Sequence, residues 1–120
     1  MNVTETKLVN LWLARRSGAV GNSSVEVAPD GDATFRLHGH PIVRVRTEDG
    51  ARMVEFTFAG WPTRVTRRRI NGILDGIGLP HPVRVYQKDR AQFARWTFSG
   101  EPGVAPIESL HEWYLAGVLR

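Results

Sequence analysis

Side chains suited to binding an anion are concentrated in one short segment in the middle of the chain. The segment contains Thr63, Arg64, Thr66, Arg67, Arg68 and Arg69, and the apolar residues that follow are spaced as on one face of a helix. Cations at the start of a helix oppose its macrodipole, so helix stability does not explain the arginines. Free backbone N–H groups, threonine hydroxyls and guanidinium groups would together hold a phosphate group or an acidic protein surface. The alternative is a solvated basic first turn, or a helix that starts further along the chain.

A second set of basic residues alternates with apolar residues along segments whose pattern is typical of strands. If helices cover one face of a sheet, the period of two assigns the apolar side chains to that face and leaves the other face basic. The outer-face residues that we expect to bind a ligand are Arg44, Arg46, Arg84, Tyr86 and Lys88. A basic surface with an aromatic ring suits single-stranded nucleic acid, because cations neutralise phosphates and the ring stacks on a base. The alternative is a solvated sheet face whose arginines cover exposed backbone.

The remaining polar residues form no pattern that predicts catalysis or a metal. The histidine groups are His38 with His40 near a turn, and Glu108 with His111 and Glu112 further along. A metal site would need the two groups to meet, and the histidine spacing is not diagnostic of zinc. The sequence has neither a Gly-x-Ser-x-Gly motif nor a phosphate-loop lysine, and its lack of cysteine excludes thiolate nucleophiles and sulfur-ligated zinc. We expect no enzyme activity, no metal and no cofactor.

Length, charge and hydropathy predict one basic domain inside a cell. At 120 residues, of which 42% are hydrophobic and 23% charged, the chain has the size and composition of a single globular domain. No apolar run is long enough to span a bilayer and the N-terminus lacks the regions of a signal peptide, so we expect a cytoplasmic protein with no membrane partner. The formal net charge is +4, and only Lys7 and Lys88 of the 16 basic residues are lysine. Arginine suits phosphate groups, although a GC-rich genome would produce the same excess.

Periodicity and turn residues predict a helix, a four-strand meander and a second helix. The first helix is expected from Thr4 to Arg16, and the strands from Ser24 to Ala28, Ala33 to His38, Ile42 to Arg46 and Met53 to Phe58. Turn sequences such as Pro29-Asp30-Gly31-Asp32 separate the strands, which favours an antiparallel meander. Thr63 or Thr66 is expected to cap the second helix, which extends to about Gly76.

The last third of the chain is predicted to contain a hairpin and a third helix. The hairpin strands are expected from Val83 to Lys88 and from Gln92 to Phe98, and a loop from Ser99 to Pro106 follows. Beyond the loop, a helical face is predicted for Ile107, Leu110, Tyr114 and Val118. The element order lacks the strand–helix alternation of a parallel sheet. The sequence therefore predicts a single α+β domain over residues 1–120, in which an antiparallel sheet has about three helices packed mainly on one face.

The expected core consists of the apolar side chains on the covered face of the sheet. They are Phe35, Leu37, Val43, Val45, Val54, Phe56, Phe58, Val83, Val85, Trp96 and Phe98. The four tryptophans are expected to anchor the core. Trp61 is also a candidate for partial exposure at a binding edge, because it lies between Gly60 and Pro62 just before the basic helix.

Several short motifs resemble those of small proteins encoded by tailed bacteriophages. The motifs are Gly60-Trp61-Pro62-Thr63-Arg64-Val65-Thr66 with Arg69-Ile70-Asn71, then Leu37-His38-Gly39-His40-Pro41-Ile42 before them and Val85-Tyr86-Gln87-Lys88 after them. The resemblance covers roughly residues 22 to 98. It provides no activity that could be transferred to this chain. It does imply a phage or prophage accessory protein that works in the cytoplasm of the host bacterium.

These observations leave three hypotheses for the function. The first is a nucleic-acid-binding accessory protein that uses the arginine cluster and the basic sheet face. A second is a modulator that docks its basic surface onto an acidic host protein. In the third, the protein is a virion or assembly component whose basic patch and edge strands serve self-association into a homo-oligomer or packing against other subunits.

Overall fold

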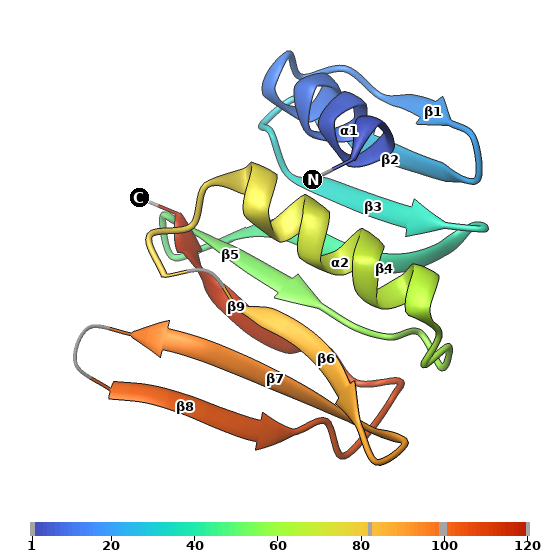
Figure 1. Ribbon diagram of the computed structural model, residues 1–120. Coiled ribbons are helices and arrows are strands. Elements are labelled where there is room, and N and C mark those ends of the chain that lie inside the picture. Colours follow the sequence, from blue (N-terminus) through green and yellow to red (C-terminus); the bar gives the residue numbers. More distant parts are fainter. Residues whose placement is uncertain (1, 82, 99–100, 120) are drawn as a thin grey trace.

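The computed structural model describes residues 2–81, 83–98 and 101–119, in which two helices accompany two antiparallel sheets (Figure 1). The helices are α1 (Val3–Leu13) and α2 (Arg64–Ile77). The larger sheet has the strand order β1 (Gly18–Val20), β2 (Ser23–Val27), β3 (Ala33–Leu37), β4 (His40–Glu48), β5 (Ala51–Phe56) and β9 (Tyr114–Leu119). The smaller sheet contains β6 (Arg84–Lys88), β7 (Ala91–Phe98) and β8 (Glu101–Pro106). The predicted α+β class with an antiparallel sheet is confirmed.

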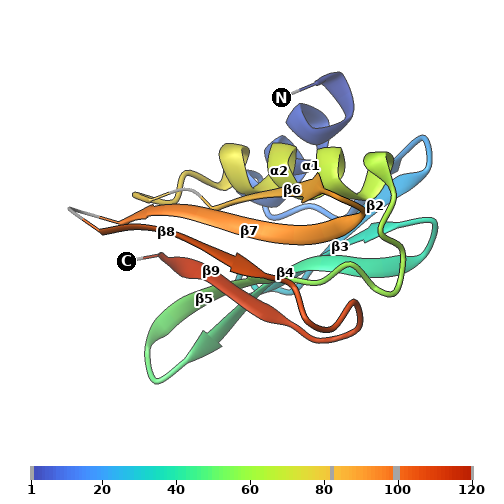
Figure 2. The ribbon, with the colours of Figure 1, turned by 60° about the horizontal axis from the view of Figure 1, so that its bottom comes forward.

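Both helices pack on the same face of the six-stranded sheet, α1 against β1 and β2, and α2 against β4 (Figure 2). The expected core residues of β3, β4 and β5 are buried between the layers, as are Val83 and Val85. Trp96 is only half-buried, and the side chain of Phe98 lies outside the described residues. Within the described part of the chain, neither helix is long and apolar enough to cross a membrane.

The bounds of both helices follow from their capping residues. Asn2, rather than the predicted Thr4, caps α1, because its side chain accepts a hydrogen bond of 3.2 Å from the Glu5 N–H. The helix ends at Leu13, before the predicted Arg16, and the backbone turns away at Arg15 with a φ of 55°. α2 is capped by Thr63, one of the two predicted caps, and it ends at Ile77, one residue beyond the predicted Gly76, where Gly78 adopts the left-handed conformation.

The predicted meander is confirmed as β2 to β5, and β1 extends it by one strand. No strand was predicted between Arg16 and Ser24, but Gly18–Val20 pairs with β2. Two-residue turns with positive φ join several of the strands, and one of them contains Asp49 and Gly50. Such turns match the right-handed twist of the strands, so they fix the register of each hairpin.

The predicted third helix is wrong, because its second half forms β9, which pairs with β5. The spacing of Ile107, Leu110, Tyr114 and Val118 fits a helix but does not require one. Without β9, the backbone groups of β5 would be unpaired at a sheet edge. The hydroxyl of Tyr114, the first residue of β9, accepts a hydrogen bond of 2.9 Å from the Ser109 N–H and donates one of 3.1 Å to the Ser109 carbonyl. These two bonds close the loop that precedes β9.

Residues 101–106, which were predicted to belong to a loop, form β8 instead. β8 lies at the edge of the small sheet, where Pro102 and Pro106 are tolerated because no further strand needs their N–H groups. Gly103 faces the ring of Trp96, and a Cβ at this position would clash with it. The glycine therefore leaves room for the indole of Trp96 across the β7–β8 pair.

Candidate functional site

A basic groove of about 750 Å³, the α2–β6 groove, lies between the second helix and the edge of the small sheet. From α2 it is lined by Arg64, Arg67, Arg68, Asn71, Gly72 and Asp75, from β6 by Arg84, Val85, Tyr86 and Gln87, and at one end by Asn2 and Glu5. Positions three and four apart on a helix share one side, which explains the contribution of α2. The groove brings together five of the predicted site residues, which come from segments about twenty residues apart.

Arg64 and Arg68 are the free cations of this groove. They lie four residues apart in the first two turns of α2, and both are exposed. Among the described residues, neither one has a hydrogen-bond or ion-pair partner. Because no carboxylate neutralises them, their charges are available to an anion in the groove.

Arg67 holds the helix against the small sheet while it keeps its charge. Its guanidinium donates hydrogen bonds of 3.0 Å to the side-chain oxygens of Gln87 and Gln92, and one of 3.1 Å to the carbonyl of Pro62. These partners are all neutral. Arg67 therefore adds a third uncompensated positive charge to the groove, although its orientation is fixed by the protein.

Asn71 fixes the other wall of the groove. Its side chain donates to the carbonyl of Val85 at 2.9 Å and accepts from the N–H of the same residue at 2.8 Å. The side chain thus takes the place of a neighbouring strand at the open edge of β6. This contact sets the separation between the arginines of α2 and the side chains of β6.

The β6 side chains that line the groove are more occupied by contacts within the protein than Arg64 and Arg68 of α2 are. Arg84 donates to Asp75 at 2.9 Å, so these two charges cancel. The ring of Tyr86 is half-buried and stacks on Phe93, with ring centroids 5.6 Å apart. Lys88 is exposed at the end of the strand and does not line the groove.

Three predicted members of the arginine and threonine cluster do not line the groove. Arg69 is buried and donates to Glu5 at 2.5 Å, and its Nε has no hydrogen-bond partner among the described residues. The hydroxyl of Thr66 is buried and lies 2.9 Å from that of Thr63. Thr63 in turn accepts from the Thr66 N–H at 3.2 Å. The threonine hydroxyls are therefore used to cap the helix.

Arg44 and Arg46 lie apart from the groove, on the sheet face opposite to the helices. Both donate to Oε1 of Glu55, at 2.9 and 2.6 Å, and Arg44 lies 4.1 Å from the ring centre of Trp113. Burial favours a higher pKa for Glu55, but the hydrogen bonds from Arg46 and Arg44 outweigh it and lower the pKa below its ordinary value. Hydrogen bonds to Glu55 and Glu48 raise the pKa of Arg46. The two arginines are thus paired with carboxylates of the protein itself.

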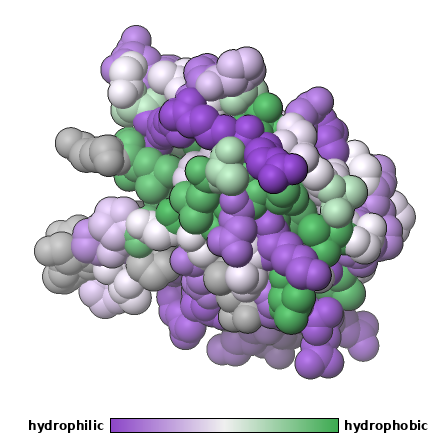
Figure 3. Space-filling view, turned by 90° about the horizontal axis from the view of Figure 1, so that it is seen from above, coloured by the Kyte–Doolittle hydropathy of each residue, from purple (hydrophilic) through white to green (hydrophobic). Residues whose placement is uncertain are grey.

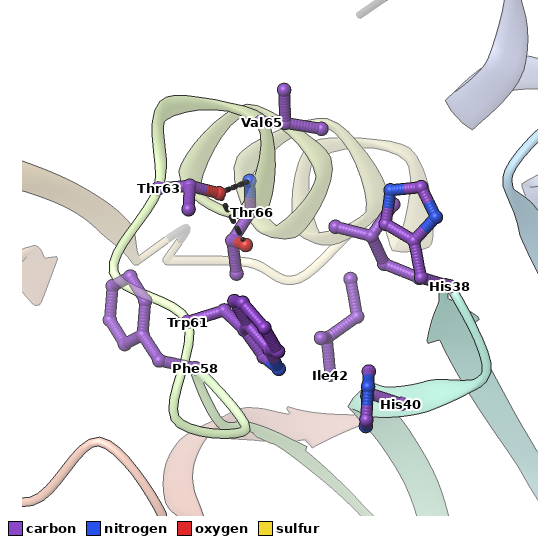
Figure 4. A pocket seen from close by; sticks show the side chains of 9 residues that line it. His38, His40, Ile42, Phe58, Trp61, Thr63, Val65 and Thr66 are labelled. Carbon is purple, nitrogen blue, oxygen red and sulfur yellow. Dashed lines mark hydrogen bonds between the residues drawn. The ribbon is translucent and has the colours of Figure 1, made fainter.

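An apolar pocket of about 360 Å³, the Trp61 pocket, opens on the other side of the first turn of α2 (Figure 4). It is lined by Leu37, His38, His40, Ile42, Phe58, Trp61, Thr63, Val65 and Thr66. Trp61 is 55% exposed, as its place beside Gly60 and Pro62 suggested. The ring centroids of Trp61 and His40 are 5.8 Å apart. Sequence reasoning missed the pocket, because its two walls come from separate turns.

The histidine groups considered as metal ligands do not form a metal site within the described residues, where no three histidine or acidic side chains come together. His40 instead contacts Trp61, and His111 packs against Gly60. His38 lines the Trp61 pocket with an exposed side chain.

Comparison with known proteins assigns a family and no further relatives. The model of the family described as Kyanoviridae Gp96 protein matches residues 1–114. No curated protein and no solved structure matches the chain.

Proposed function

We propose that this chain, which belongs to the Kyanoviridae Gp96 family of phage proteins, is a phage accessory protein that binds nucleic acid through the α2–β6 groove. The observation that supports this proposal is the uncompensated charge of Arg64, Arg67 and Arg68 on one side of α2. The two carboxylates of the groove are already paired, Glu5 with Arg69 and Asp75 with Arg84. A line of phosphates would supply the missing negative charge.

The proposal predicts a binding energy that comes mainly from phosphate contacts. Each contact releases counterions, so the affinity depends steeply on salt. With three contacts, the affinity should fall roughly 20- to 40-fold between about 50 and 200 mM salt. Tyr86 lines the same groove and would add a ring contact to a sugar or base, although Phe93 stacks on its ring and the Arg95 guanidinium lies 5.8 Å from the ring centre.

The test is fluorescence anisotropy with labelled single-stranded DNA, duplex DNA and single-stranded RNA at these two salt concentrations. The groove variant carries Arg64→Glu and Arg68→Glu. Neither substitution breaks an internal contact, and acidic residues in the first turns favour the helix macrodipole, so the variant should fold. We expect its affinity for nucleic acid to fall at least about tenfold at the lower salt concentration, as two phosphate contacts are lost and repulsion is added.

A matched control carries Lys7→Glu and Arg16→Glu. These two exposed cations lie in a different surface hollow beside α1, and the control changes the net charge by the same amount as the groove variant. Equal losses in both variants would mean that only overall charge matters, and would remove the groove as the site. Absence of binding by the wild type at low salt would overturn the proposal and favour an acidic host protein as the partner.

A further inference from the structure

We propose that the Trp61 pocket receives an unstacked base of a strand bound in the α2–β6 groove, so that the ligand is single-stranded nucleic acid. This inference rests on the proposed function and narrows its ligand. The pocket and the groove flank the same helical turn: Val65 and Thr66 line the pocket, and Arg64 and Arg67 line the groove. A helix with its side chains is about 10–12 Å wide. A nucleic-acid strand that crosses this turn of the helix would therefore contact the cations first and the aromatic surface next.

The pocket combines an open aromatic wall with a buried apolar floor. Trp61 and His40 are exposed, while Leu37, Ile42 and Phe58 beneath them are buried. Figure 4 shows the indole of Trp61 between Phe58 and Ile42, below Thr63 and Thr66. A volume of about 360 Å³ lies near the lower end of the range for small-ligand pockets, roughly 300 to 1,000 Å³. One planar ring is therefore a suitable occupant.

Isolated apolar side chains on other surfaces do not have this character. Seen from above, on the side of α1, hydrophobic and hydrophilic side chains lie next to each other on the surface (Figure 3). Val3 and Leu13, at the two ends of α1, are exposed apolar residues. Scattered exposed residues of this kind are normal and need no ligand. Trp61 differs because it borders a hollow whose floor is continuous with the core.

Two tight turns hold the pocket open. His38 and Gly39 lie between β3 and β4 with φ values of 51° and 81°, and Ala59 and Gly60 precede Trp61 with φ values of 52° and 84°. A left-handed conformation is unfavourable for alanine, and such strain is often found at functional sites. The second turn is fixed further by the Gly60 N–H, which donates to the carbonyl of Leu110 at 2.7 Å. Trp61 is thus presented on a rigid support.

A base fits this position better than an apolar side chain of a protein partner. The cations beside the pocket lack counter-charges, and a sugar-phosphate backbone carries one charge for every base it presents. Duplex DNA does not satisfy the geometry, since its bases are paired and stacked and reach a pocket only after extrusion. Stacking on an aromatic ring is also tolerant of sequence, which suits a small accessory protein.

The test compares a single-stranded oligothymidylate with an abasic strand of the same length, using fluorescence anisotropy. The two strands carry the same phosphates, so they differ only in bases. We expect the wild type to prefer the strand with bases by roughly 5- to 150-fold, which is the effect of one base–aromatic stack. Trp61→Ala should remove most of this preference and leave the affinity for the abasic strand unchanged, whereas Trp61→Phe should keep most of it.

Leu115→Ala provides the control, because Leu115 is also 55% exposed but lies on β9, away from the pocket. Its base preference should equal that of the wild type. Equal affinity for both strands, with both lost in the Arg64→Glu, Arg68→Glu variant, would overturn the pocket proposal and support the groove. Absence of binding to either strand would overturn both. Tighter binding of duplex DNA than of oligothymidylate would exclude the single strand as the ligand.

Discussion

Arg69 of α2 and Glu5 of α1 form an ion pair of 2.5 Å in which both side chains are buried. This pair joins the helices at the point where they pack against each other. Glu5 occupies the space beside Gly72, where a Cβ would overlap its carboxylate. The third arginine of the run at 67–69 is therefore a structural residue, and the charge of the groove comes from its neighbours.

Removal of one partner of this ion pair should destabilise the protein strongly. Arg69→Ala or Glu5→Ala leaves an unpaired charge in the interior, and we expect a loss of about 3–5 kcal/mol in the free energy of unfolding. The double variant should lose clearly less than the sum of the single losses, because neither charge remains. Urea denaturation of the four proteins measures these values. Additive losses would show that the pair is not coupled.

Replacement of Gly72 by alanine should destabilise the protein, whereas the same substitution in a helix usually stabilises it. Alanine in a helix is normally more stable than glycine by about 1 kcal/mol. At this position, however, the new Cβ would displace the buried carboxylate of Glu5, so we expect Gly72→Ala to be destabilising. In a Glu5→Ala background the same change should be neutral or stabilising. Urea midpoints decide between these outcomes, and a gain in stability in the wild-type background would contradict the packing described above.

The sequence predicts best what depends on neighbouring residues. α2 with its Thr63 cap and the hairpins with tight turns are local features, and the structure confirms them. The helix predicted over residues 107–118 failed because the alternative is a strand whose partner, β5, lies about sixty residues away. Apolar spacing in one segment carries no information about such a partner.

The sequence also does not show which part of the fold each site residue faces. Arg67, Arg68 and Arg69 are equivalent in the sequence, but each helical residue is turned by about 100° from the last. Arg67 therefore faces β6, Arg68 lines the α2–β6 groove with an exposed side chain, and Arg69 faces α1. The Trp61 pocket could have been inferred only by joining two motifs, at 37–42 and 60–66, that the sequence keeps apart.

The Glu55 network predicts a stability that depends on pH. Because its pKa is lowered in the folded protein, Glu55 stabilises the fold above the ordinary carboxyl pKa of about 4.5, and this contribution is lost as the pH falls through the folded value. Glu55→Gln should lower the stability at pH 7 by about 1.5–3 kcal/mol and flatten the acid dependence. Glu26→Gln is the control, since Glu26 lies 3.6 Å from Arg36 and is mostly exposed. Urea midpoints at pH 7 and pH 3 test both variants, and parallel acid curves for Glu55→Gln and the wild type would refute the assignment.

Asn71 should be required for the alignment of β6 beside α2. Asn71→Ala removes both hydrogen bonds to the backbone of Val85 and leaves its groups at an open strand edge, so we expect a loss of about 1–3 kcal/mol. Amide hydrogen exchange of Val85 should also become faster, because its N–H loses its acceptor. Asn10→Ala makes the same chemical change at an exposed position of α1 and should be neutral or slightly stabilising. If both variants are equally stable and Val85 exchanges at the wild-type rate, Asn71 does not hold the strand. If Val85 is released as expected, the groove owes its width to this one amide.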